Sequence, residues 1–220
     1  MPAPPNPHQA ALAQYRRRAS IYDVELALFE PIRRAAVAQL GLKPGDTVID
    51  AGCGTGLSLP LLRAAVGARG RVVGIEQCPE MLAKAHACVL QHRWHNVTLI
   101  EASVEDAPLA SATRRRADAA LFHFTHDILR APPAIANVLR ALRPGAGVVA
   151  CGLKWSAPWA WPVNLFVFGA ALHSVSSVSG LAQPWSLLAP QLDRFEVDSV
   201  AAGAVFIARG ILPEATPRRS

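Results

Sequence analysis

Cysteine and charged residues are both scarce in this sequence. The four cysteines among its 220 residues form no CxxC pair, which argues against a disulfide framework or a structural zinc site and favours a reducing, cytoplasmic compartment. Charged residues make up 17% and hydrophobic residues 51%, which excludes a disordered chain and predicts a substantial core. A clean run of about 20 apolar residues is also lacking, so a membrane-spanning helix is not expected.

Basic residues outnumber acidic residues by 22 to 16, and the resulting net charge of +6 favours contact with an anionic surface or substrate. The arginines are dispersed in short runs, however, at 16–18, 33–34 and 114–116. We interpret these runs as solvated helix faces, because short basic runs usually lie on such faces. The charge is therefore attributed mainly to solubility.

Short runs rich in valine and isoleucine alternate with longer helical stretches through the middle of the chain. The predicted strands are 47–52, 71–76, 97–102, 117–124 and 147–153, and the predicted helices between them are 57–66, 79–90 and 132–142. Strands without polar alternation, separated by helices, indicate a parallel sheet covered on both faces. The pattern predicts a doubly wound α/β fold with its ligand at the carboxyl ends of the strands.

These elements are expected to form a single domain over residues 9–210. A polar, proline-rich leader (1–8) is expected before it and a short tail (211–220) after it. Within the domain, residues 9–40 carry helix-like spacing.

Residues 155–192 depart from the alternating pattern. They contain four of the five tryptophans and none of the Asp, Glu, Lys or Arg residues. Charge returns in 193–200 and 205–210, which alternate like a strand hairpin at a sheet edge. We expect 155–192 to be an apolar insertion placed where a cap over the substrate could form, the alternatives being a packing insert or a dimer surface.

The segment VIDAGCGTG (48–56) carries the strongest chemical signal. It turns from a predicted strand into a predicted helix, and its glycines let a ligand approach the bare N–H groups at the helix start. Leu57 stands where the third glycine of the dinucleotide motif would fall, and Asp50 would repel a diphosphate. Asp50 instead suits a ligand with an ammonium or sulfonium group.

Glu76 lies at the end of the next predicted strand, in VVGIEQCPEML. A carboxylate at this position can accept hydrogen bonds from the two hydroxyls of a ribose. The glycine loop and this acid, in this order and spacing, predict a nucleoside ligand.

VIDAGCGTG, GIEQCPEML, VTLIEASVEDAPL and NVLRALRPGAGVV resemble the successive motifs of class I S-adenosylmethionine-dependent methyltransferases, and the match runs from Tyr15 to Arg209. The resemblance implies an enzyme with S-adenosyl-L-methionine as cofactor and a seven-stranded, Rossmann-like sheet with an antiparallel C-terminal hairpin. The resemblance also implies that the glycine loop holds the methionine portion of the cofactor, that the acid after the second strand binds the ribose, and that residues after the third strand flank the adenine. Carried over, the cofactor-binding positions are Asp50, Gly52, Gly54, Thr55, Gly56, Glu76, Gln77, Met81, Ser103, Val104 and Phe122. Many relatives have Asp where Ser103 stands, and a serine hydroxyl is a weaker acceptor.

The N-terminal YRRRASIYD (15–23) resembles the lid segment of the branch that holds quinone C-methyltransferases and bacterial phosphatidylethanolamine N-methyltransferases. This resemblance makes Tyr15 and Tyr22 candidate contacts to the cofactor. Packing within a helical pair is the alternative.

Candidate proton acceptors follow the fourth predicted strand in LFHFTHDIL: His123, His126 and Asp127. Alternatively, His123 lies against the methionine end of the cofactor, and His126 and Asp127 cap the next helix. FHFT stands where methyltransferases of nucleobase amines have an Asn/Asp-Pro-Pro-aromatic signature, so no nucleic-acid partner is expected. No metal site is expected either.

The apolar insertion favours a small or lipid-like acceptor, with peripheral contact at a membrane or a homodimer as further options. The alternatives from other classes are a non-catalytic binding module and an NAD-dependent oxidoreductase.

Overall fold

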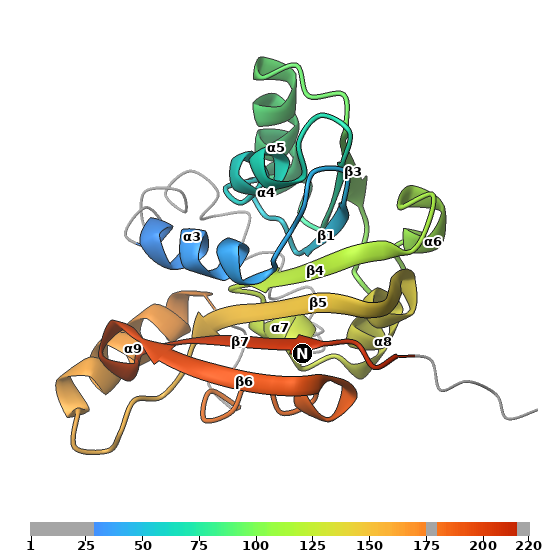
Figure 1. Ribbon diagram of the computed structural model, residues 1–220. Coiled ribbons are helices and arrows are strands. Elements are labelled where there is room, and N and C mark those ends of the chain that lie inside the picture. The colour runs from blue at the N-terminus through green and yellow to red at the C-terminus, as the bar shows by residue number, and fades with distance from the viewer. Residues whose placement is uncertain (1–28, 175–179, 215–220) are drawn as a thin grey trace, which may run out of the picture.

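The computed structural model describes residues 29–174 and 180–214, and the chain there forms one seven-stranded sheet with helices on both faces (Figure 1). The strand order is β3-β2-β1-β4-β5-β7-β6. The first five strands are parallel, and β7 runs antiparallel to both β5 and β6. The strands are β1 (Thr47–Ala51), β2 (Arg71–Glu76), β3 (Val97–Glu101), β4 (Ala117–His123), β5 (Leu142–Leu153), β6 (Asp193–Val200) and β7 (Val205–Ile211). The predicted fold class, including the antiparallel C-terminal hairpin, is confirmed.

Seven α-helices are described in these residues, and they divide between the two faces of the sheet. They are α3 (Glu30–Gln39), α4 (Leu59–Val66), α5 (Pro79–Gln91), α6 (Leu109–Ala112), α7 (His126–Leu129), α8 (Pro132–Ala141) and α9 (Trp161–Ser174). Side chains of α3, α4, α5 and α9 share one buried cluster, and those of α6, α7 and α8 share the other. Val48 and Ile49 in β1 point into different clusters, which explains why the strands are apolar on both faces.

Strand β5 begins five residues before the predicted start, at Leu142 rather than at residue 147. Its first residues, LRPGA, read as a turn because they contain Pro144 and Gly145, and Gly145 does adopt a positive φ of 71°. Leu142 nevertheless pairs with Ala117, and the register then shifts before Ala119 pairs with Gly147. The register shift allows the strand to continue past the turn residues.

The apolar segment between β5 and β6 contacts both faces of the sheet. Val167 and Leu181 lie in the cluster that contains α3, whereas Leu188 and Leu192 lie in the cluster that contains α8. Within the described ranges, none of the helices has the length and apolar character needed to cross a bilayer.

One side of this segment remains in contact with solvent. Four large apolar side chains, which we call the α9 face, are exposed: Trp159 (84%), Trp161 (69%), Leu165 (64%) and Phe168 (42%). They lie on or just before α9, which follows the carboxyl end of β5 (Figure 1).

Candidate functional site

The glycine loop between β1 and α4 lies at the carboxyl edge of the sheet. The backbone N–H groups of Gly52 and Cys53 both donate to the carbonyl of Ile75, at 3.0 and 2.8 Å, which holds the loop against β2. Gly52 has a φ of 79°, and a Cβ atom at this position would lie 2.5 Å from Cγ2 of Thr125. A side chain at residue 52 would therefore clash with the loop after β4.

Glu76 connects the second strand to this loop. Its Oε2 accepts a hydrogen bond of 3.0 Å from the backbone N–H of Gly54, and its Oε1 accepts one of 2.8 Å from the N–H of Cys78. Burial raises the pKa of Glu76, and these N–H donors oppose the rise. The backbone N–H of Gln77 also donates to this carboxylate. Because a carboxylate has about four lone-pair sites, it can accept a further hydrogen bond from a ligand hydroxyl.

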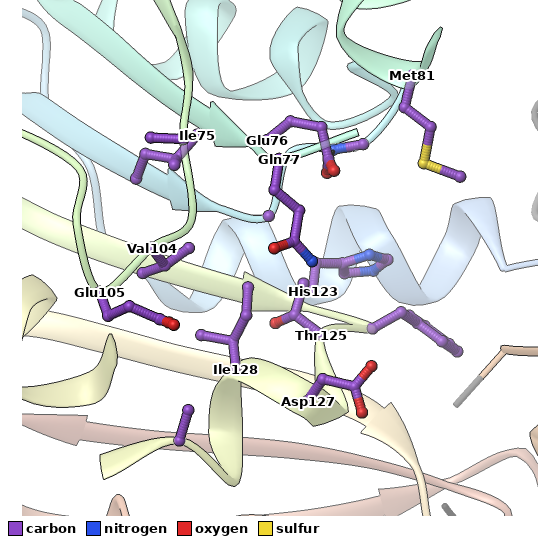
Figure 2. A pocket seen from close by; sticks show the side chains of 15 residues that line it. Ile75, Glu76, Gln77, Met81, Val104, Glu105, His123, Thr125, Asp127 and Ile128 are labelled. Atoms are coloured by element: carbon purple, nitrogen blue, oxygen red, sulfur yellow. Dashed lines mark hydrogen bonds between the residues drawn. The ribbon is translucent and has the colours of Figure 1, made fainter. Parts of the chain in front are cut away.

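A cavity of about 190 Å³, which we call the main cavity, opens beside Glu76. Glu76, Gln77 and Met81 line one side, and His123, Thr125, Asp127 and Ile128 line the opposite side (Figure 2). Its remaining walls are Gly52, Gly54, Ile75, Ala102, Val104, Glu105, Phe124 and Ala131. Loops from β1, β2, β3 and β4 therefore build this cavity together.

A second space of about 20 Å³, which we call the inner cavity, shares Gly52, Gly54 and His123 with the main cavity. Its other walls are Arg33, Asp50, Cys53, Thr55, Leu57 and Ser58. The shared residues place the two spaces next to each other, and we treat them as two chambers of one candidate site.

Asp50 lies in the inner cavity with 1% of its surface exposed. Burial raises the pKa of Asp50 to about 7, with Arg33 opposing the rise and Glu76 adding to it. Among the described residues, Asp50 Oδ2 has no hydrogen-bond partner. A buried carboxylate oxygen in this state favours a ligand that donates hydrogen bonds and carries positive charge.

His123 lies where the two chambers meet, and its ring packs 4.9 Å from that of Phe124. Burial, with a smaller contribution from the charge of Arg33, lowers the pKa of His123 to about 3. The imidazole is therefore neutral at physiological pH.

Arg33 is a site residue that the sequence analysis did not identify, and the interpretation of the 33–34 run as a solvated face is wrong for this residue. Only 2% of Arg33 is exposed, whereas the side chain of Arg34 is 64% exposed. A signal was present in the sequence, because Arg33 shares a helical stripe, at positions i, i+3, i+4 and i+7, with the buried residues Ala36, Val37 and Leu40.

The structure places Phe124, rather than the predicted Phe122, in the wall of the main cavity. Phe122 is fully buried in the core on the face of the sheet that α8 covers. Phe124 has a φ of 57°, which is rare for a bulky side chain, and its ring packs 5.0 Å from that of Phe29. This backbone turn at the strand end redirects the side chain, and strand alternation alone could not reveal it.

His126 and Ser103 are not among the described residues that line the two cavities. His126 is buried, its Nε2 lies 2.9 Å from the carbonyl oxygen of Leu153, and it is absent from the described walls of both cavities. Ser103 donates a hydrogen bond of 2.7 Å to Asp106 Oδ2, and its neighbours Ala102 and Val104 line the cavity instead.

The remaining predicted positions divide between cavity and packing. Gln77, Met81, Val104 and Asp127 line the main cavity, and Thr55 lines the inner one. Gly56 has a packing role, because a Cβ atom there would lie 2.8 Å from Leu59 Cδ1. Tyr15 and Tyr22 fall outside the described residues.

The site fits a nucleoside that bears a cationic amino-acid chain. Glu76 can accept from a sugar hydroxyl, and Gly52 and Gly54 bring the backbone of the glycine loop to the cavity walls. Asp50 has an oxygen without a partner among the described residues, which an ammonium group could fill. A diphosphate would meet the buried carboxyl of Asp50, which disfavours a nicotinamide dinucleotide. In the part of the chain that the structure describes, no group of His, Cys, Asp and Glu is arranged to hold a metal ion.

Comparison with known proteins also indicates a protein that binds such a nucleoside, a methyltransferase. A family model described as a methyltransferase domain matches residues 48–145. The chain is 27% identical over 196 residues to the 2-phytyl-1,4-naphtoquinone methyltransferase of Nostoc, covering 84% of this chain and 83% of that protein. It is 28% identical over 141 residues to the arsenite methyltransferase of Halobacterium salinarum, covering 62% of this chain and 33% of that longer protein.

Among solved structures, the N-methyltransferase NodS from Bradyrhizobium japonicum, in complex with S-adenosyl-L-homocysteine, superposes with a TM-score of 0.65 at 17% identity. The alignment covers 93% of this chain and 99% of that one, and it shows a shared fold. Residues 48–145 thus match a methyltransferase domain, and together with the relatives and the shared fold this match supports a class I S-adenosylmethionine-dependent methyltransferase. When bound, the cofactor would supply an electrophilic methyl group on its sulfonium. The residues of the chain would bind the cofactor, align the acceptor with the methyl group and exclude water.

Proposed function

We propose that this methyltransferase acts on a small, apolar or lipid-like acceptor that it takes from the surface of an anionic membrane. The exposed α9 face carries the proposal. Its side chains of Trp159, Trp161, Leu165 and Phe168 are 42–84% exposed, and clustered apolar side chains of this size mark interaction sites. Tryptophan is enriched at membrane–water interfaces, where its amphipathic ring is favoured.

The charges near the α9 face suit an anionic lipid surface. Residues 155–192 contain no Asp or Glu, and the chain carries a net charge of +6. Lys154 immediately precedes the segment, and the Arg130 side chain lies beside Gly180 within it. Acidic headgroups would therefore be attracted to this side of the protein.

The position of the α9 face relates it to the methyl donor. It follows the carboxyl end of β5, and the main cavity lies at the carboxyl ends of β1, β2 and β4, which run parallel to β5 in the same sheet. An acceptor held at the membrane surface would thus be presented to the edge of the sheet that carries the site. The naming of the Nostoc relative for a phytyl-substituted naphthoquinone adds support for an acceptor of this class.

The cavity wall gives a role to Asp127 when the acceptor must lose a proton. Asp127 lies at the wall of the main cavity, opposite Glu76 and Gln77 (Figure 2). The ring of His126 is engaged with Leu153 and is absent from the described cavity walls, and the ring of His123 packs against Phe124, whereas Asp127 brings a carboxyl group to the wall. We therefore assign proton removal to Asp127 and positioning in the cavity to His123.

Incubation with S-adenosylmethionine labelled in the methyl group and a cell lipid extract tests the acceptor class. Label is expected in an organic-extractable product. Label that enters only water-soluble products would refute the lipid-like acceptor.

Co-sedimentation with vesicles tests the membrane contact independently. The protein is expected to bind vesicles that contain phosphatidylglycerol more strongly than vesicles of pure phosphatidylcholine, and the double variant Trp161→Ser/Leu165→Ser is expected to lose this binding. Leu90→Ser is the control, because Leu90 is 75% exposed but lies on α5. Equal binding by all three proteins would refute the assignment, as would a wild-type dimer that the double variant converts into a monomer.

A further inference from the structure

Arg33 is a buried cation that the reaction described so far does not use. It lies in the middle of α3 with 2% of its surface exposed, and Nη1 pairs with the carboxylate of Glu30. Within residues 29–174 and 180–214, its Nε and Nη2 atoms have no hydrogen-bond partner. Buried donors without acceptors are destabilising, so this guanidinium favours the arrival of an acceptor group.

The unpartnered guanidinium atoms belong to a side chain that lines the inner cavity. Asp50 and His123 share the wall with Arg33, and each of these two side chains also has a buried atom without a partner in the described residues, Oδ2 and Nε2 respectively. The inner cavity thus presents a fixed cation, a carboxyl group and an imidazole. A zwitterionic amino-acid group matches this set, because its carboxylate complements Arg33 and its ammonium complements Asp50.

We propose that Arg33 binds the α-carboxylate of the cofactor's amino-acid portion and thereby selects amino-acid-bearing nucleosides over nucleosides that lack this group. The assignment rests on the identity of the cofactor and is independent of the acceptor proposed above. Glu30 holds one guanidinium nitrogen and so orients the remaining donors, which is an arrangement that suits the planar fork of arginine. A lysine at this position would supply the positive charge but not the planar set of N–H donors that arginine has.

Calorimetric titration with two ligands isolates this contact. S-adenosylhomocysteine carries the amino-acid portion, whereas 5′-methylthioadenosine has the same nucleoside and sulfur without it. Arg33→Met is expected to weaken binding of S-adenosylhomocysteine by about 10- to 150-fold, the usual range for a hydrogen bond to a charged group, and to change binding of methylthioadenosine less than about twofold. Arg33→Lys is expected to fall between wild type and Arg33→Met.

Arg34→Met provides a matched control on the same helix. Arg34 also contacts Glu30, at 2.9 Å, but its side chain is 64% exposed and it is not among the described walls of the inner cavity. Its affinities for both ligands should equal those of the wild-type protein.

Two outcomes would overturn the proposal. One is an equal loss of affinity for both ligands in Arg33→Met, which would mean that Arg33 only supports the fold or pairs with an acid of residues 1–28. The other is unchanged binding of S-adenosylhomocysteine. If the variants do not fold, as judged by circular dichroism, the wild-type protein still decides: the methyl ester of S-adenosylhomocysteine, which lacks the carboxylate charge, should bind at least about tenfold more weakly than the parent.

Discussion

Because the carboxyl of Asp50 is buried, we expect binding of S-adenosylhomocysteine to depend on pH in a range where the charges of the ligand itself change little. Burial, with a smaller contribution from Glu76, raises the pKa of Asp50 to about 7 in the free protein, against the opposing effect of Arg33. An ammonium group next to Asp50 would favour the ionised carboxylate. Ligand and proton therefore compete, so affinity is full above the pKa of the free protein and falls as the pH drops below it.

The size of the effect follows from the fraction of Asp50 that is ionised. With a pKa of about 7, roughly 3% of the carboxyl is ionised at about pH 5.5 and roughly 76% at about pH 7.5. If only the ionised form binds the ammonium, affinity should rise by about 25-fold across this interval, or about 2 kcal/mol. Binding at about pH 6 should also release close to one proton.

Isothermal titration calorimetry in buffers of different ionisation enthalpy measures both quantities. Methylthioadenosine, which lacks the ammonium, reports the pH dependence of the nucleoside portion, including any part due to Glu76. Asp50→Asn should weaken binding at about pH 7.5 and remove the excess pH dependence of S-adenosylhomocysteine. If the two ligands show the same slope in the wild-type protein, the reasoning about Asp50 is refuted.

Four substitutions test other parts of the site. Gly52→Ala should destabilise the protein by about 2 kcal/mol and lower Tm by about 4–8 °C, because it adds a clash with Thr125 to backbone strain; Gly41→Ala, with a φ of 61° but nothing within 4 Å, is the control and should lower Tm less. Glu76→Gln should weaken calorimetric binding of S-adenosylhomocysteine by about 10- to 100-fold and also lower Tm, since the amide oxygen can still accept from Gly54 but the amide NH2 would then face the backbone N–H of Cys78. His126→Ala should cost about 2–4 kcal/mol in denaturant unfolding while cofactor affinity stays unchanged, because the ring packs within the protein and contacts Leu153. Asp127→Asn should leave cofactor affinity unchanged and lower turnover of a protonated acceptor at least about 100-fold in a labelled-methyl assay; equal turnover would remove Asp127 as the proton acceptor.

The fold could be predicted from the sequence because its signals are local. Valine- and isoleucine-rich runs placed four of the first five strands to within a residue of their observed bounds, and glycines marked the loop before α4. β5 was predicted too short because Pro144 and Gly145 indicate a turn wherever they occur. A sequence pattern does not show that pairing with β4 and β7 extends through such a turn.

The site was predicted less completely, because several of its features depend on contacts that are distant in sequence. Arg33 lies on an element that precedes the first strand, and its burial depends on how α3 packs against the sheet. The choice between Phe122 and Phe124 depends on one backbone angle at the end of β4. His126 carried the right chemistry for a base, but its orientation toward Leu153 was not encoded in the spacing.

The hydrogen bond between Gly54 and Glu76 has a consequence for how this enzyme could diverge in specificity. Because the carboxylate of Glu76 both holds the glycine loop and lines the main cavity, replacing it would disturb two parts of the site at once. The glycine loop and the end of β2 are therefore constrained to keep binding the methyl donor. The residues after β4 and in the long connection after β5 do not hold the glycine loop through Glu76. Changes among them can therefore accommodate new acceptors while recognition of the methyl donor is retained.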